Sequence, residues 1–266
     1  MAGLKQEKTA EGISSKYALC LVDVKNLGTR TFSYIIPDVL RRDIKIGQAV
    51  SVPFGNRKQS IIAFVTGFSD YLEEGIKAKE IIKIIDKKPV FTDNYIKLLD
   101  YTGNYYCCDI NTVMQAAIPM KFLKENSSAT KKEKTEKYII FKSKENASSN
   151  QLKILNILEE YKFKTVLLNG VTGSGKTEIY FRAIKKVIDL GKNVLFLAPE
   201  IALASQLTMR LIKRFDEKQI AIWHSSISEG EKFDVWNKLR NEEIKIIIGA
   251  RSAVFAPLNN IGLVII

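Results

Sequence analysis

The residues with the clearest chemistry form a glycine-rich segment, GVTGSGKT, from Gly170 to Thr177, which matches the pattern G-x-x-x-x-G-K-[ST]. Glycines let the backbone curl so that its N–H groups face phosphate oxygens, and a following helix adds the positive end of its dipole. Lys176 would reach the β- and γ-phosphates and Thr177 would hold Mg²⁺, so these two are the predicted catalytic residues. The motif predicts a site for nucleotide phosphates and Mg²⁺ formed by Gly170, Val171, Thr172, Gly173, Ser174, Gly175, Lys176 and Thr177. The alternative is a glycine-rich turn that binds nothing.

The class of phosphate-loop protein is a separate question, because kinases, GTPases and motors share the loop. A GTPase needs a guanine-reading NKxD, and the nearest string is NKLR at Asn237–Arg240, on a predicted helix. That observation argues against a GTPase. A small-molecule kinase stays open, but it leaves the N-terminal half of the chain unexplained.

The elements around the loop alternate between short apolar runs and helical patterns. The runs are 165–168, 194–197, 220–223, 244–248 and 263–266, and the helices lie near 151–161, 176–190, 202–215 and 229–241. This alternation predicts a parallel sheet covered on both faces, a doubly wound α/β domain with a strand directly before the phosphate loop. Pro199, Glu200 and the turn from Gly249 to Ser252 follow predicted strands, at the edge where such folds bind ligands.

The first half of the chain has a different pattern. Runs rich in β-branched and aromatic residues at 17–24, 31–36, 49–53, 60–68 and 80–85 are separated by turn-forming residues. They predict a small, barrel-like all-β module. Two short helices, at 93–107 with Thr92 as N-cap and at 113–118, are expected to close it.

Composition agrees with a globular protein that binds a polyanion. The chain has 266 residues, with 41 Lys and Arg against 29 Asp and Glu, a net charge of +12 that favours nucleic acid as the partner. The three cysteines form neither a disulfide framework nor a metal pair, which predicts reduced thiols and a cytoplasmic location. No apolar segment is long enough to predict a membrane span.

Four strings together carry a family resemblance: GVTGSGKTEIY from Gly170, LAPEIALASQL from Leu197, WHSSISEGEKFDVW from Trp223 and IIIGARSAVFAPLNNIGLVII from Ile246. In order and spacing they resemble the first helicase lobe of the PriA family, bacterial replication-restart DNA helicases of superfamily 2. RTFSYIIPD, VSVPFGNRKQ and KPVFTDNYIKLLDYTGNYY resemble the domain of that family that captures the 3′ end of a nascent strand. The resemblance covers residues 17–120 and 150–266.

The resemblance implies a multidomain, ATP-dependent 3′ to 5′ helicase that recognises forked DNA and restarts replication. Its implied partners are forked and single-stranded DNA with a free 3′ end, single-strand-binding protein and primosome proteins, with no membrane. It assigns the 3′-end site to Phe32, Ser33, Gly55 and Lys79, with Phe32 stacking on a base and Lys79 facing a phosphate. Family members usually carry Asp where Ser33 stands. The ordinary alternatives are a core residue for Phe32, a turn residue for Gly55 and a solvated charge for Lys79.

Three further positions have weaker sequence signals. The resemblance makes Gln151 a candidate adenine-reading residue and Arg251 a candidate contact to the DNA backbone, although a lone glutamine at a helix start is usually polar surface. His224, the only histidine, has no partner for acid–base or metal chemistry in the sequence, so a structural or DNA-side role is favoured. Phe233, Trp236 and Leu239 repeat at helical spacing and are predicted core residues.

Composition predicts a flexible arm at 1–16, which is polar and unpatterned, and a charged, Ser-rich linker at 121–149 with one strand at 138–141. The resemblance implies a 3′-end DNA-binding domain at 17–120, no winged helix in the linker, and a truncated first helicase lobe at 150–266. The sequence stops before the acidic DExH segment, so this chain is expected to lack full ATP turnover, and a Zn²⁺ site is expected only in a C-terminal part beyond it. The rival interpretation is a DNA-end-binding module whose phosphate loop senses nucleotide without driving a motor.

Overall fold

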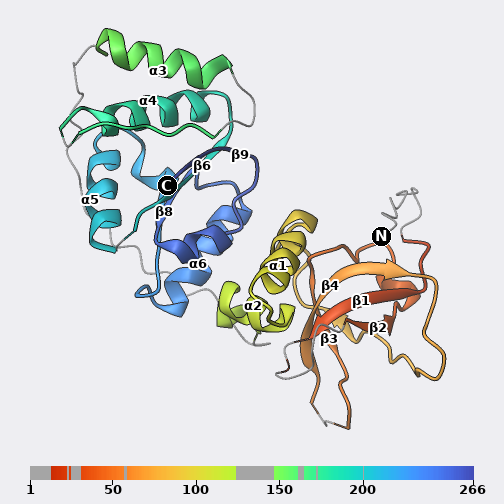
Figure 1. Cartoon of the computed structure of the whole chain (residues 1–266). Helices are drawn as coiled ribbons and strands as arrows, with labels where there is room; N and C mark the ends of the chain where they lie inside the picture. Colours follow the sequence, from red (N-terminus) through yellow and green to blue (C-terminus); the bar gives the residue numbers. More distant parts are fainter. Residues whose placement is uncertain are drawn as a thin grey trace. The chain divides into compact units, whose positions relative to one another are not determined.

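The computed structural model describes residues 13–22, 24, 31–56, 59–123, 147–160, 165–171, 173–199 and 201–266. The chain divides into two compact units, an N-terminal unit, Met1–Ala129, and a C-terminal unit, Thr130–Ile266, each of which is described by itself (Figure 1). Most of the predicted linker, including the strand expected at 138–141, lies outside the described residues.

The N-terminal unit contains a five-stranded sheet in the order β2-β1-β4-β3-β5. Its strands are β1 (Tyr17–Val22), β2 (Phe32–Ile35), β3 (Ala49–Val52), β4 (Ile61–Ser69) and β5 (Lys83–Ile84). All four neighbouring pairs are antiparallel. Each strand coincides with a run that the β-branched and aromatic pattern predicted, with β4 extending one residue beyond its run to Ser69, so the all-β prediction is confirmed.

The two edges of this sheet are joined by the chain that leads into β5. Ile35 of β2 donates its N–H to the carbonyl of Lys79 at 2.9 Å and accepts from the N–H of Ile81 at 3.1 Å, which forms a parallel bridge between Ile35 and Glu80. The closed arrangement encloses alternate residues of each strand, because successive side chains of a strand point to opposite faces. The resulting core consists of Ala18, Cys20, Val22, Tyr34, Ile36, Ile44, Val50, Val52, Ala63, Val65 and Ile81.

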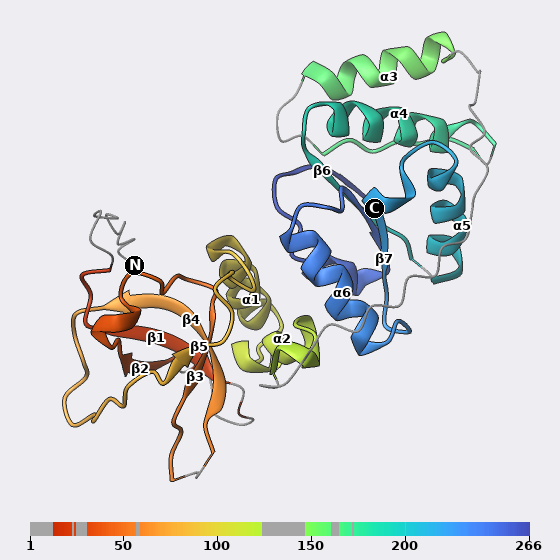
Figure 2. The same ribbon diagram turned by 180° about the vertical axis from the view of Figure 1, so that it is seen from behind.

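Two helices cover the outside of the barrel, as Figure 2 shows from behind. α1 spans Asp93–Tyr105 and α2 spans Ile110–Ala117, which begins three residues earlier than the sequence predicted. Aromatic rings bind α1 to the sheet: Phe91 lies 5.3 Å from Phe64 of β4 and 5.5 Å from Tyr95, centre to centre. Thr92 occupies the predicted N-cap position, but its side chain makes no capping hydrogen bond.

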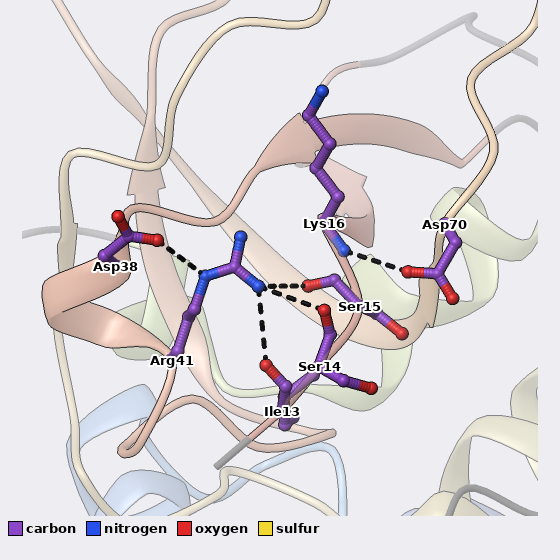
Figure 3. A network of polar contacts seen from close by, with 7 residues as sticks. All are labelled: Ile13, Ser14, Ser15, Lys16, Asp38, Arg41 and Asp70. Atoms are coloured by element: carbon purple, nitrogen blue, oxygen red, sulfur yellow. Dashed lines mark hydrogen bonds and ion pairs between the residues drawn. The ribbon is translucent and has the colours of Figure 1, made fainter. Parts of the chain in front are cut away.

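The chain before β1 is held by Arg41 (Figure 3). The guanidinium Nη1 donates to the carbonyls of Ile13, Ser14 and Ser15 at 3.5, 3.1 and 3.1 Å, and Nε pairs with Asp38 at 2.9 Å. On the other side, the backbone N–H of Lys16 donates to Asp70 at 3.2 Å. Residues 13–16, which the sequence places in a flexible arm, are therefore fixed to the barrel.

The C-terminal unit contains a parallel sheet in the order β7-β8-β6-β9. The strands are β6 (Asn193–Leu197), β7 (Ile220–Trp223), β8 (Ile246–Gly249) and β9 (Ile261–Ile265), and the helices are α3 (Ser149–Glu160), α4 (Lys176–Asp189), α5 (Ile201–Ile212) and α6 (Glu229–Arg240). α4 and α5 pack on one face of the sheet. On the other face Trp236 of α6 lies 5.9 Å from Trp223 of β7, ring centre to ring centre, so helices cover both sides (Figures 1 and 2).

One predicted strand of this unit is wrong. Residues 165–168, expected to be a strand before the phosphate loop, have no regular secondary structure. β9 is the edge of the sheet, with β6 as its one neighbour, and Leu167 is 91% exposed. An apolar run of four residues becomes a strand only when a neighbouring strand takes up its backbone hydrogen bonds, and here none does so.

The remaining expectations about the fold can be checked within the described residues. Phe233, Trp236 and Leu239 are buried, as predicted. All three cysteines are free thiols. No helix in the described ranges combines the length and the apolarity that a membrane span requires.

Candidate nucleotide and DNA sites

The phosphate loop leads directly into α4, which begins at Lys176. Gly173 and Gly175 have φ angles of 82° and 84°, a left-handed conformation that side chains with a Cβ disfavour and that turns the backbone sharply. Lys176 donates its ammonium group to the carbonyls of Gly170 and Val171, the latter at 3.0 Å. The lysine therefore points back over the loop, where a phosphate could replace these carbonyls as its acceptor. Thr172 lies outside the described residues.

Gln151 lies beside this loop. Its side-chain amide Nε2 donates to the carbonyl of Gly175 at 3.4 Å, while its Oε1 accepts from the N–H of Ser148 at 2.9 Å. The hydroxyl of Ser148 in turn accepts from the N–H of Gln151 at 3.3 Å, which closes a capping box at the start of α3. The structure thus brings the predicted Gln151 to the phosphate loop, whereas its contact with adenine stays a prediction.

The other predicted positions of this unit lie at the carboxyl ends of the strands. Pro199 follows β6 and is exposed, and Arg251 is exposed at the start of the 3₁₀ helix η4 (Arg251–Phe255) that follows β8. His224 follows β7, and its Nδ1 accepts from the N–H of Ser226 at 3.2 Å within a turn. A DNA-side role for His224 stays a prediction. Glu200 lies outside the described residues. DNA contact by Arg251 remains a prediction.

In the N-terminal unit, three of the four predicted 3′-end residues lie close together. Phe32 packs edge-on against Phe54, with ring centres 5.2 Å apart. The ammonium group of Lys79 donates to the carbonyl of Gly55, the residue after Phe54, at 2.7 Å. Three segments therefore meet at one place on the barrel: β2, the turn after β3 and the segment before β5. They bring an aromatic ring, a backbone turn and a cation close together.

The conformation of Gly55 explains why glycine stands there. Its φ of 54° is left-handed, and a Cβ at this position would meet nothing within 4 Å. Space above the residue is therefore open, and only the backbone angle disfavours a side chain. Ser33 pairs with Leu19 across β1 and β2, and the alternation of the strand places it on the opposite face from Phe32. Ser33 is the one member of the predicted set that this geometry separates from the others.

Two features of these sites are not visible in the sequence. Phe54 adjoins Gly55 in the string PFG, and its contact with Phe32 becomes visible only when β2 and β3 are placed in the sheet. In the C-terminal unit, Glu178 of α4 binds Arg182 and Arg214. An acidic residue in the first turn of α4 signals a favourable interaction with the helix dipole, but the sequence does not reveal the arginine from a later element.

The phosphate loop has the residue types that ATP and Mg²⁺ need: turned glycine backbone, a flexible ammonium group and a threonine hydroxyl at the first turn of a helix. Within the described ranges, no group of three or more His, Cys, Asp or Glu side chains could hold a metal ion. The hydroxyl of Thr177, in the first turn of α4, fits a Mg²⁺ ion brought by the nucleotide.

Comparison with protein families matches both units. The model of the PriA 3′ DNA-binding domain matches residues 20–119, and the model of the DEAD/DEAH box helicases matches residues 148–266. These ranges contain the barrel site and the phosphate loop, respectively.

Curated relatives match the chain across both units. The replication restart protein PriA of Rickettsia conorii is 34% identical over 236 residues, which is 88% of this chain and 34% of the relative. That of Treponema pallidum is 30% identical over 246 residues, covering 89% and 36%. That of Bacillus subtilis is 48% identical over 113 residues, covering 42% and 14%. The chain spans about a third of the length of the first and second of these relatives.

Proposed function

The chain belongs to the PriA family, and we propose that it forms the part of a replication-restart helicase that captures the 3′ end of a DNA strand and binds ATP. The observation that carries the proposal is the pairing of two sites on one chain. A barrel with an aromatic and cationic cluster lies in the range of the 3′ DNA-binding model, and a phosphate loop lies in the range of the helicase model.

The barrel cluster suits a strand terminus. Phe32 and Phe54 are partly buried against the barrel core, and the part of these rings that stays accessible would stack on a terminal base. Base stacking on aromatic side chains contributes about 1–3 kcal/mol per base. Lys79 supplies the charge for a neighbouring phosphate, and the open space at Gly55 leaves room for the end of the strand. The net charge of +12 favours association with the rest of the DNA.

The phosphate loop suits ATP. Lys176 and the backbone N–H groups of the loop would bind the β- and γ-phosphates, Thr177 would hold Mg²⁺, and Gln151 would read the base. Bound Mg²⁺ neutralises charge on the phosphates during hydrolysis. Beyond binding, we infer that the whole protein moves 3′ to 5′ along DNA and assembles a primosome with single-strand-binding protein. Membership of the family and the name of its relatives, replication restart protein, support this step.

The test of the 3′-end site compares two labelled forked DNAs that differ in one group, a 3′ hydroxyl or a 3′ phosphate on the nascent strand. We expect the 266-residue chain to bind the hydroxyl form more tightly at matched salt, because a terminal phosphate adds bulk and charge at a site for a small hydroxyl. Equal affinities would reduce DNA binding to general charge attraction. A parallel titration with a fluorescent ATP analogue and Mg²⁺ tests the phosphate loop independently.

A further inference from the structure

A group of charged residues outside the phosphate loop joins two helices of the C-terminal unit. Glu178 lies in the first turn of α4, directly after Thr177. Its Oε1 is 2.8 Å from Nε of Arg182 in the same helix. Its Oε2 is 2.7 Å from Nη2 of Arg214, which follows the end of α5. The carboxylate therefore connects the beginning of one helix to the end of another.

The ion pair between Glu178 and Arg214 is partly buried, and an aromatic ring packs against its guanidinium group. The two side chains are 15% and 25% exposed. The guanidinium carbon of Arg214 also lies 5.0 Å from the centre of the Phe181 ring, which is buried. A planar guanidinium can bind a carboxylate and stack on an aromatic ring at the same time, which an ammonium group cannot do equally well. The hydrogen bond from Arg214 is the main cause that lowers the pKa of Glu178 below its ordinary value, so the carboxylate is charged at neutral pH.

Glu178 and Arg214 stand between two functional segments. α4 begins with Lys176 and Thr177 of the phosphate loop, and α5 begins at Ile201, just after Pro199 at the carboxyl end of β6. We propose that Glu178 and Arg214 are positioning residues that transmit nucleotide binding at the phosphate loop to α5. The inference rests on the proposed binding of nucleotide to this loop.

The physical basis is that the nucleotide would fix the turn of α4 in which Glu178 lies. Because the carboxylate is bonded to Arg214, and Arg214 is packed on Phe181, a better ordered first turn of α4 also orders the end of α5. An ion pair within one helix cannot do this. Lys185 and Asp189 of α4 make such a pair, at 2.9 Å with side chains 69% and 59% exposed, and they provide a matched control.

Amide hydrogen exchange measured by mass spectrometry tests the proposal with no need for hydrolysis. The exchange of two peptides, 173–189 with α4 and 201–216 with α5, is compared with and without Mg²⁺ and ADP at about ten times the dissociation constant, determined for each variant. In the parent chain we expect about tenfold slower exchange at the start of α4 and about threefold slower exchange in α5. In Glu178→Gln and Arg214→Met the slowing in α4 should persist and that in α5 should disappear. Lys185→Gln should behave as the parent chain.

Each outcome decides something. Slowing in α5 that survives in Glu178→Gln or in a folded Arg214→Met overturns the proposal, as does a parent chain in which only α4 responds. Loss of the α5 response in Lys185→Gln as well would assign it to general helix stability and also overturn the proposal. A parent chain in which neither peptide responds at any nucleotide concentration refutes nucleotide binding itself, and the inference fails with it. Circular dichroism on the variants distinguishes lost transmission from lost folding, and if Arg214→Met does not fold, the isosteric Glu178→Gln carries the test.

Discussion

The two candidate sites differ in what holds their backbone. At the barrel site, both the backbone and the side chain of Lys79 are hydrogen-bonded. Its carbonyl accepts from the N–H of Ile35 in β2, and its ammonium group donates to the carbonyl of Gly55. The phosphate loop follows residues 165–168, which have no regular secondary structure, and Lys176 bonds to carbonyls of the loop itself. The barrel site is fixed by strand pairing from several elements, whereas the phosphate loop is held by the helix that follows it and by the amide of Gln151 from α3.

Because of this difference, ligand binding should order the protein to a different extent at the two sites. A site built on paired strands is already ordered, so a DNA end that binds there need not order the protein. A loop that no paired strand precedes becomes more ordered when phosphate binds, and part of the binding free energy offsets the lost conformational freedom. We therefore expect substitutions in the phosphate loop to change affinity strongly, and substitutions at the barrel to change selectivity more than overall binding.

The largest expected effect is that of Lys176→Ala. Charge-assisted hydrogen bonds contribute about 1.5–3 kcal/mol each, so loss of the ammonium group should weaken binding of a fluorescent ATP analogue about 30-fold or more. The fold should survive, because Lys176 contacts loop carbonyls and not the core. Binding of 3′-hydroxyl DNA to the barrel should be unchanged. Equal nucleotide affinity in variant and parent would contradict the assignment of this loop.

Phe32→Ala should have the next largest effect, and it acts on the other site. Loss of one stacked base predicts an affinity for 3′-hydroxyl DNA about tenfold lower, with nucleotide binding unaffected. Tyr71→Ala is the matched control, because Tyr71 is an aromatic residue of the same unit that is 87% exposed and lies outside the site. Fluorescence anisotropy at several salt concentrations separates stacking from charge attraction, which alone depends steeply on salt. A loss as large in Tyr71→Ala would contradict a specific site.

The sequence pattern predicted the strands of the barrel almost completely, because short antiparallel strands show alternation and are bounded by turn residues. It did not give all of their pairings, since β1 also pairs with β4 and β5 pairs with β3, both far apart in sequence. It failed at residues 165–168. An apolar run states that a segment can be buried, but whether it becomes a strand depends on an available edge, and that depends on distant parts of the chain. The same limit applies to Phe54 and Arg214, whose partners are set by the sheet and the helix packing.

The predicted site residues had a similar outcome. Motif spacing placed Lys176 and Thr177 at the start of α4, because the loop and the helix are contiguous in sequence. The resemblance grouped Phe32, Gly55 and Lys79, which the barrel brings together, but it included Ser33, which alternation turns to the other face. Sequence motifs therefore do not predict which residues from distant segments come into contact.

Gly55→Ala tests the contribution of the backbone conformation at the barrel site. A left-handed φ costs a residue with a Cβ about 1–2 kcal/mol, so the N-terminal unit should lose about that much stability in urea denaturation. Gly75→Ala is a close control, because Gly75 has a φ of 82° and, like Gly55, open space where a Cβ would stand. Both substitutions should destabilise the unit similarly, while only Gly55→Ala should lower the preference for a 3′ hydroxyl, by a few fold. Equal selectivity in the two variants would remove Gly55 from the site.

The smallest expected effect concerns acid, and it separates the C-terminal unit from the barrel. The arginines lower the pKa of Glu178 from an ordinary value of 4.5, so the folded unit binds the proton of this group less readily than the unfolded chain does. The stabilisation is therefore fully present above pH 4.5, falls as the pH drops from there towards the lowered pKa, and is absent below it. Because the pair is partly exposed to solvent, it contributes at most about 1 kcal/mol.

Urea denaturation of the parent chain and of Glu178→Gln, at pH 7 and at steps below pH 4.5, measures the difference. The variant should be less stable at neutral pH, and the gap should close as the pH falls, while a gap that stays constant with pH would assign the loss to packing and not to the charge of Glu178.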